Sequence, residues 1–119
     1  MNHIELGRKG EEIAAHFLIS KGYRILDRNF KLKNAELDIV CEKDDLLIVV
    51  EVKTRNSTAL GEPYLAVNRS KQKQIVRVTN HFIQVNNVEN DIQFDVVSII
   101  LNQHQLKIEH IENAFYPIA

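Results

Sequence analysis

The chain has 119 residues, of which 45% are hydrophobic and 26% charged, and its formal net charge is −1. This length fits one domain over residues 1–119 with an ordinary core, and a single cysteine excludes an internal disulfide framework. No apolar stretch reaches the roughly 18 residues that a membrane-spanning helix needs, and the N-terminus lacks the apolar run of a signal peptide. We therefore expect a cytoplasmic protein with no membrane partner.

A helix is predicted over residues 2–21. Its apolar and small residues recur at three- and four-residue spacing, and Gly22 is a natural C-terminal stop. Gly7 and Gly10 each cost a helix about 1 kcal/mol relative to alanine, so we expect another element to pack closely against them. The predicted inward stripe consists of Ile4, Gly7, Gly10, Ile13, Ala14, Phe17 and Leu18.

The rest of the chain predicts five strands and one more helix. The alternation of the first strand breaks at Asp27-Arg28-Asn29, which predicts a bulge there. The order helix, three strands, helix, two strands indicates an α/β fold with one mixed sheet flanked by two helices. The predicted strands are 23–33, 36–42, 46–55, 92–101 and 106–111, and the second helix is 70–85.

The strand LLIVVEVKTR, residues 46–55, ends on two opposite charges, Glu51 and Lys53. A two- or four-residue turn before it sets Asp38 opposite Glu51, whereas a three-residue turn puts the two on different faces. Facing carboxylates repel. The pair of Asp38 and Glu51 is therefore favourable only if a positive charge lies beside it, either Lys53 on the same face or a hard cation such as Mg²⁺. Glu11, on the stripe of the first helix, could approach the same site. The alternative is a plain ion pair between Glu51 and Lys53.

Positive charge is concentrated in the middle of the chain. Residues 52–80 contain six Lys/Arg and one acid, whereas residues 81–119 contain five acids and one Lys. Basic side chains of this kind position a nucleic-acid backbone without reading its sequence, or they simply solvate an exposed face. The predicted nucleic-acid-binding residues are Arg55, Arg69, Lys71, Lys73 and Arg77.

An acid on one strand followed by Glu-x-Lys on the next resembles the PD-(D/E)xK nuclease superfamily. Motifs along nearly the whole chain resemble, more closely, the YraN family of small bacterial proteins, which are similar in fold to archaeal Holliday-junction resolvases. These motifs are GRKGEE at Gly7, RNF at Arg28, AELDIV at Ala35, VVEVKTR at Val49, AVNRSKQ at Ala66, FDVVSI at Phe94 and ENAF at Glu112.

The resemblance implies a restriction-endonuclease-like core in which Glu11, Asp38 and Glu51 hold Mg²⁺ or Mn²⁺. It implies Lys53 as catalytic base or transition-state stabiliser, beside Asp38 and Glu51. The expected function is metal-dependent hydrolysis of phosphodiester bonds in branched or structured DNA, by a homodimer if two strands are cut. The alternative is a nucleic-acid-binding or partner-docking protein with a vestigial nuclease site.

Overall fold

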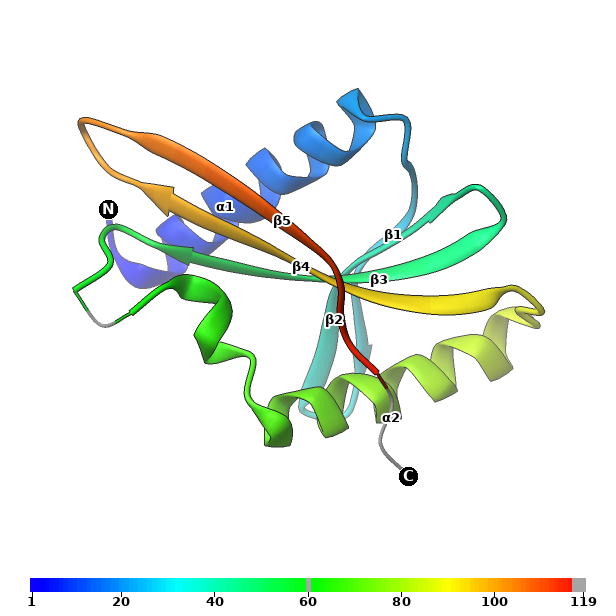
Figure 1. Ribbon diagram of the computed structural model, residues 1–119. Helices are drawn as coiled ribbons and strands as arrows, with labels where there is room; N and C mark the ends of the chain where they lie inside the picture. The colour runs from blue at the N-terminus through cyan, green and yellow to red at the C-terminus, as the bar shows by residue number, and fades with distance from the viewer. Residues whose placement is uncertain (60, 117–119) are drawn as a thin grey trace.

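Five strands form one mixed sheet between two helices in a computed structural model that describes residues 1–59 and 61–116 (Figure 1). The predicted order of elements and the α/β fold are confirmed, and the architecture is consistent with a restriction-endonuclease-like core. A short 3₁₀ helix, η1, was not predicted. The elements are α1 (His3–Ser20), β1 (Arg24–Leu32), β2 (Ala35–Lys43), β3 (Leu46–Arg55), η1 (Pro63–Ala66), α2 (Arg69–Asn86), β4 (Asp91–Leu101) and β5 (Leu106–Phe115).

The strands lie in chain order across the sheet, β1-β2-β3-β4-β5. Only β3 and β4 are parallel neighbours within this sheet, and the other adjacent pairs are antiparallel. A parallel pair requires a crossover connection, and here η1 and α2 provide it. Neither helix of the described chain combines the length and apolarity needed to cross a membrane.

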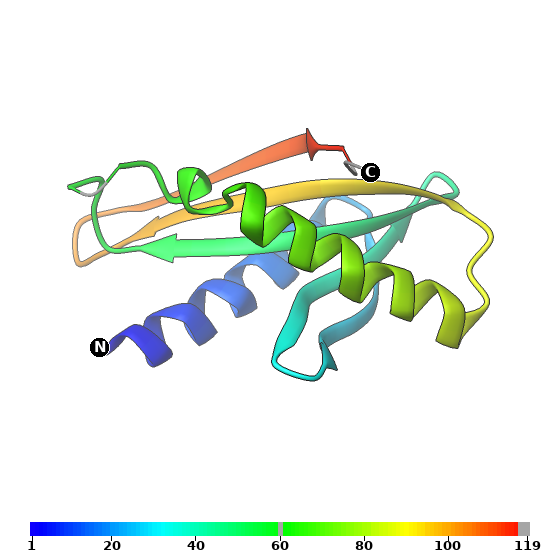
Figure 2. The same cartoon turned by 90° about the horizontal axis from the view of Figure 1, so that it is seen from below.

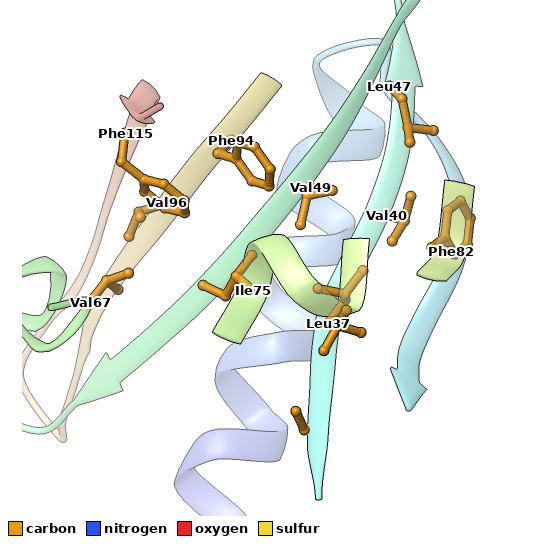
Figure 3. Packing of buried hydrophobic residues seen from close by; sticks show 12 residues of the cluster. Leu37, Val40, Leu47, Val49, Val67, Ile75, Phe82, Phe94, Val96 and Phe115 are labelled. Atoms are coloured by element: carbon orange, nitrogen blue, oxygen red, sulfur yellow. The ribbon is translucent and has the colours of Figure 1, made fainter. Parts of the chain in front are cut away.

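The two helices cover opposite faces of the sheet, and each face has its own apolar cluster. On one face, Ile75 and Phe82 of α2 pack over Leu37, Val49 and Phe94 (Figure 3). On the other face, α1 packs over the alternate residues of β2 and β3. The buried residues that these three elements contribute to this cluster are Ala14, Ala15 and Leu18 of α1, Ile39 and Cys41 of β2, and Ile48, Val50 and Val52 of β3. The alternation along β2 and β3 thus fills both cores.

Helix α1 follows the predicted stripe except at its N-terminal end. Ile4 is 68% exposed. Close packing is found at Gly10, where an added Cβ would lie 1.8 Å from the Thr54 hydroxyl oxygen. At Gly7 an added Cβ would meet nothing within 4 Å, so the prediction of close packing at Gly7 is wrong.

Two strands differ locally from the prediction. The bulge expected at Asp27-Arg28-Asn29 lies one residue earlier, at Leu26, where the pairing of β1 with β2 shifts. Asn29 itself adopts a left-handed backbone with φ of 57°. Strand β5 continues four residues past Ile111, to Phe115. Left-handed Asn113 breaks the alternation in this extension. The strand predicted from the alternation of the sequence therefore ended too early.

Strands β2 and β3 pair in the predicted register from Lys43–Leu46 to Ile39–Val50, and there the ladder ends. The hairpin end of β1 and β2 then turns away from the other strands (Figure 2). We call this opening between β2 and β3 the fork. The next residue of each strand, Asp38 on β2 and Glu51 on β3, lies where the fork begins. The twist of the hairpin thus opens space beside two acids.

Candidate metal centre

Three carboxylates from α1 and β2 converge at the fork. Carboxylate oxygens of Glu11, Glu36 and Asp38 lie within 4.8 Å of one another. Asp38 is only 8% exposed, whereas Glu11 and Glu36 are half-buried and reachable from solvent. Several carboxylate oxygens with room for water are the ligands that Mg²⁺ and Mn²⁺ prefer. The donor set therefore fits a hard divalent cation, and we call it the acidic triad.

Asp38 is held by one backbone contact in an acidic environment. Its Oδ2 accepts a hydrogen bond from the backbone N–H of Val52 at 2.8 Å. Burial, and then the neighbouring carboxyls of Glu51 and Glu11, raise the pKa of Asp38 to about 8, although the Val52 N–H acts in the opposite direction. A cation beside Asp38 would remove this penalty on its charged form.

Glu51 lies next to Asp38 but is paired with two lysines. Its Oε1 is 3.4 Å from Nζ of Lys71 on α2 and 4.0 Å from Nζ of Lys53 on the same strand. Burial raises the pKa of Glu51, which is 3% exposed, while Lys71 and Lys53 pull that pKa down. Two lysine side chains therefore compensate one buried carboxylate. Lys53 comes from the sheet and Lys71 from the helix α2 that covers it.

The left-handed residue of β1 positions the carboxylate that α1 supplies. Asn29 donates from Nδ2 to Oε1 of Glu11 at 2.9 Å. Next to it, Nη1 of Arg28 lies 3.1 Å from Oε1 of the following helix residue, Glu12. The RNF motif therefore ties α1 to the sheet at the level of the acidic triad.

The acidic triad contains a residue that the sequence analysis did not propose as a ligand. A regular continuation of the hairpin register sets Glu36 opposite Lys53, but the fork carries Glu36 toward Glu11 instead. The spacing Glu36-x-Asp38 was the available signal, because alternate residues of a strand share a face. Among the described residues, the triad includes Glu36 rather than Glu51.

The predicted nucleic-acid-binding residues fall into three groups. Lys71 faces the fork, where a cavity of about 430 Å³ also contains Glu36. Arg55 and Lys53 line a second cavity, of about 300 Å³, at the C-terminal end of β3. The remaining residues line a separate cavity on the outer side of α2, and these are Arg69, Lys73 and Arg77.

Comparison with known proteins identifies the family. Residues 10–99 match the sequence model of the Uncharacterised protein family UPF0102. A UPF0102 protein of Flavobacterium psychrophilum is 39% identical over 114 residues, covering 96% of each chain. One from Thermodesulfovibrio yellowstonii is 40% identical over 116 residues, 98% of this chain and 100% of the relative. One from Syntrophomonas wolfei is 47% identical over 112 residues, 93% of this chain and 97% of the relative. The resemblance to the YraN family is confirmed, and the chain belongs to the uncharacterised protein family UPF0102.

Proposed function

We propose that this protein is a metal-dependent endonuclease that hydrolyses phosphodiester bonds in branched or otherwise structured DNA. The observation that carries the proposal is the convergence of the acidic triad beside the Glu51–Lys53 pair in an open fork. Carboxylates that hold a cation next to a lysine form a site that can activate water against a phosphodiester. A cavity beside the fork, lined by Glu36 and Lys71, would take part of a nucleic-acid backbone.

Mg²⁺ or Mn²⁺ would be held by Glu11, Glu36 and Asp38, with Glu51 as the adjoining carboxylate. When bound, such an ion polarises the phosphate and lowers the pKa of water. Asp38 suits this role because its neighbours penalise its negative charge until a cation arrives. Asn29 keeps Glu11 turned toward the same point.

The two lysines that pair with Glu51 have different roles in this proposal. Lys53, on the same strand as Glu51, orients or deprotonates the attacking water and offsets charge that grows on the phosphate. Lys71 reaches the fork from α2 and neutralises Glu51. Its ammonium group is therefore within reach of a phosphate that enters the fork, and we assign Lys71 to the phosphate contact.

The test is a cleavage assay with branched, flapped and linear DNA in Mg²⁺ and in Mn²⁺. We expect cleavage of a branched substrate by the parent protein, and its loss in Lys53→Ala and in Asp38→Asn. Lys107→Ala is the matched control, because Lys107 is an exposed lysine of β5. If Lys53→Ala cleaves at the parental rate, Lys53 is only a counter-ion and the mechanism fails.

Metal titration separates the proposal from its non-enzymatic alternative. Calorimetry with Mn²⁺ should show that Lys53→Ala keeps metal affinity, because all four carboxylates remain, while Asp38→Asn loses it. A parent protein that binds nucleic acid but cleaves none of the substrates with either metal would favour the binding or docking protein with a vestigial site.

A further inference from the structure

A second basic site lies on the outer side of α2, separate from the fork. A cavity of about 220 Å³ opens there between the helix and the end of β5. Arg69, Lys73 and Arg77 line it together with Asn80 and Tyr116. The three cations are exposed, whereas Lys71, two positions from Arg69 and from Lys73, points to the other side and pairs with Glu51.

The three cations stand in one row without an acidic partner. They are spaced four residues apart, so their charges are neighbours on the helix surface and repel one another. None of the ion pairs in the described ranges, 1–59 and 61–116, involves Arg69, Lys73 or Arg77. An anion from outside the chain would relieve this repulsion.

The length of the row argues for a chain of anions. Arg77 lies eight positions beyond Arg69, a span of about 12 Å along the helix axis. A row of this length suits successive phosphates of a nucleic-acid strand, with one cation for each. The formal net charge of −1 means that this attraction is local and is not a property of the whole molecule.

Tyr116 specifies which kind of strand fits. Its side chain is 69% exposed and lines the same cavity as the three cations. An accessible aromatic ring beside a positively charged row is the arrangement that binds single-stranded nucleic acid, since unpaired bases stack on the ring while the cations follow the backbone. The bases of a duplex are already stacked and do not offer a free face.

We propose that Tyr116 with Arg69, Lys73 and Arg77 binds an unpaired strand of nucleic acid, with one base on the tyrosine ring and consecutive phosphates along α2. The choice of DNA as that nucleic acid rests on the proposed function. The site then holds a single-stranded arm of the substrate outside the fork, and it gives a role to the three cations of α2 that face away from Lys71.

The test is fluorescence anisotropy of the full chain with a labelled single-stranded DNA and with a duplex of equal length, in EDTA so that no cleavage occurs. We expect Tyr116→Ala to weaken single-strand binding about tenfold, because stacking is worth about 1–3 kcal/mol per base. Tyr116→Phe keeps the ring and should bind nearly as the parent does. Duplex binding should be unchanged in both variants.

The cations are tested through salt dependence. The triple variant Arg69→Ala, Lys73→Ala, Arg77→Ala should flatten the slope of log affinity against log salt by about 2, since each contact to a single strand contributes about 0.7. Lys107→Ala is the control and should leave the slope unchanged. An RNA strand of the same sequence should bind with similar affinity, because stacking and phosphate contacts do not distinguish the two sugars.

The results separate this inference from the proposed function. Loss of single-strand binding in Tyr116→Ala, together with a parent protein that cleaves nothing, would support the inference while the nuclease proposal fails. Unchanged single-strand affinity in Tyr116→Ala and an unchanged salt slope in the triple variant would overturn the inference even if cleavage is observed. An equal loss for single strand and duplex would also overturn it.

Discussion

Two aspartates are buried in the same sheet, Asp95 on β4 and Asp38 on β2, and their surroundings differ in kind. Asp95 is fully buried and accepts hydrogen bonds from the backbone N–H of Asn113 and the side-chain amide of Gln93, each at 3.0 Å. Its other oxygen lies 2.8 Å from Nε2 of His110. Every oxygen of this carboxyl group has a partner, as a structural role requires.

Asp38 has one hydrogen-bond donor among the described residues, the backbone N–H of Val52, and three further acids lie around it. The nearby lysines pair with Glu51, not with Asp38. By residue type and burial alone, the two aspartates look alike. What separates them is the sign of their neighbours, because an acid among acids is stable only if it holds a proton or a cation.

The largest expected difference between the two sites is in stability. Asp95→Ala should lower the free energy of unfolding by about 3 kcal/mol or more, since it leaves the Asn113 N–H and the buried ring of His110 without partners. Asp38→Ala should change it by less than about 1 kcal/mol, because a lost hydrogen bond is offset by relief of repulsion from Glu51. Urea denaturation of both variants without metal measures this. Equal losses would end the distinction between the two aspartates.

The second expected effect is a pH dependence that comes from Asp38. Its pKa is about 8 in the folded protein against an ordinary value of 3.8, so the folded state binds the extra proton between these values. The contribution of Asp38 to stability is therefore fully present below about pH 4 and is lost as pH rises toward about pH 8 in the metal-free protein. The raised pKa of Glu51 acts in the same direction.

Asp38→Asn cannot ionise and should flatten this profile. The measurement is the free energy of unfolding at a series of pH values in EDTA, for the parent and for Asp38→Asn. A parental profile that is flat, or that rises with pH between 4 and 8, would contradict the environment described for Asp38.

The third expected effect is stabilisation by metal at the fork. Mn²⁺ at about ten times its Kd should raise the free energy of unfolding by about 1.4 kcal/mol. Glu36→Gln should reduce this gain, since it removes one carboxylate of the acidic triad. Glu42→Gln is the matched control, because Glu42 is on the same strand but pairs with Arg24 at the surface. If both variants respond to Mn²⁺ like the parent, the triad is not the metal site.

The hairpin register was predictable from sequence, and the fork was not. The short turn between β2 and β3 fixes the pairing up to Ile39–Val50, because the length of the turn sets the register of a hairpin. Where the ladder ends depends on the twist of the β1–β2 hairpin against the other strands, which no local pattern encodes. Glu36 was therefore missed as a member of the acidic triad.

The helices show the same limit. The stripe of α1 and the position of Glu11 on it were predicted, because a helix has a fixed period. The contact of Lys71 with Glu51 depends on how α2 lies across the sheet, and its charge pattern alone could not distinguish it from Lys73. Sequence periodicity thus indicates which face a side chain occupies, and tertiary packing decides what that face meets.

The smallest expected effect concerns two asparagines that share a backbone conformation, one at each aspartate site. Asn29 and Asn113 are both left-handed, with φ near +50°. Asn29 acts through its side chain, which donates to Glu11, whereas Asn113 acts through its backbone N–H, which donates to Asp95. Glycine tolerates this φ and keeps the N–H but has no side-chain amide. The same substitution to glycine should therefore affect only the fork.

We expect Asn29→Gly to lower Mn²⁺ affinity by about tenfold or less, as loss of a group that orients a metal ligand does, and Asn113→Gly to leave that affinity unchanged. Both variants should unfold within about 0.5 kcal/mol of the parent, because neither backbone is strained by glycine. Calorimetric titration with Mn²⁺ and urea denaturation measure the two quantities on the same samples. If Asn113→Gly weakens metal binding as much as Asn29→Gly does, the effect spreads through the sheet, and the orienting role assigned to the Asn29 side chain is wrong.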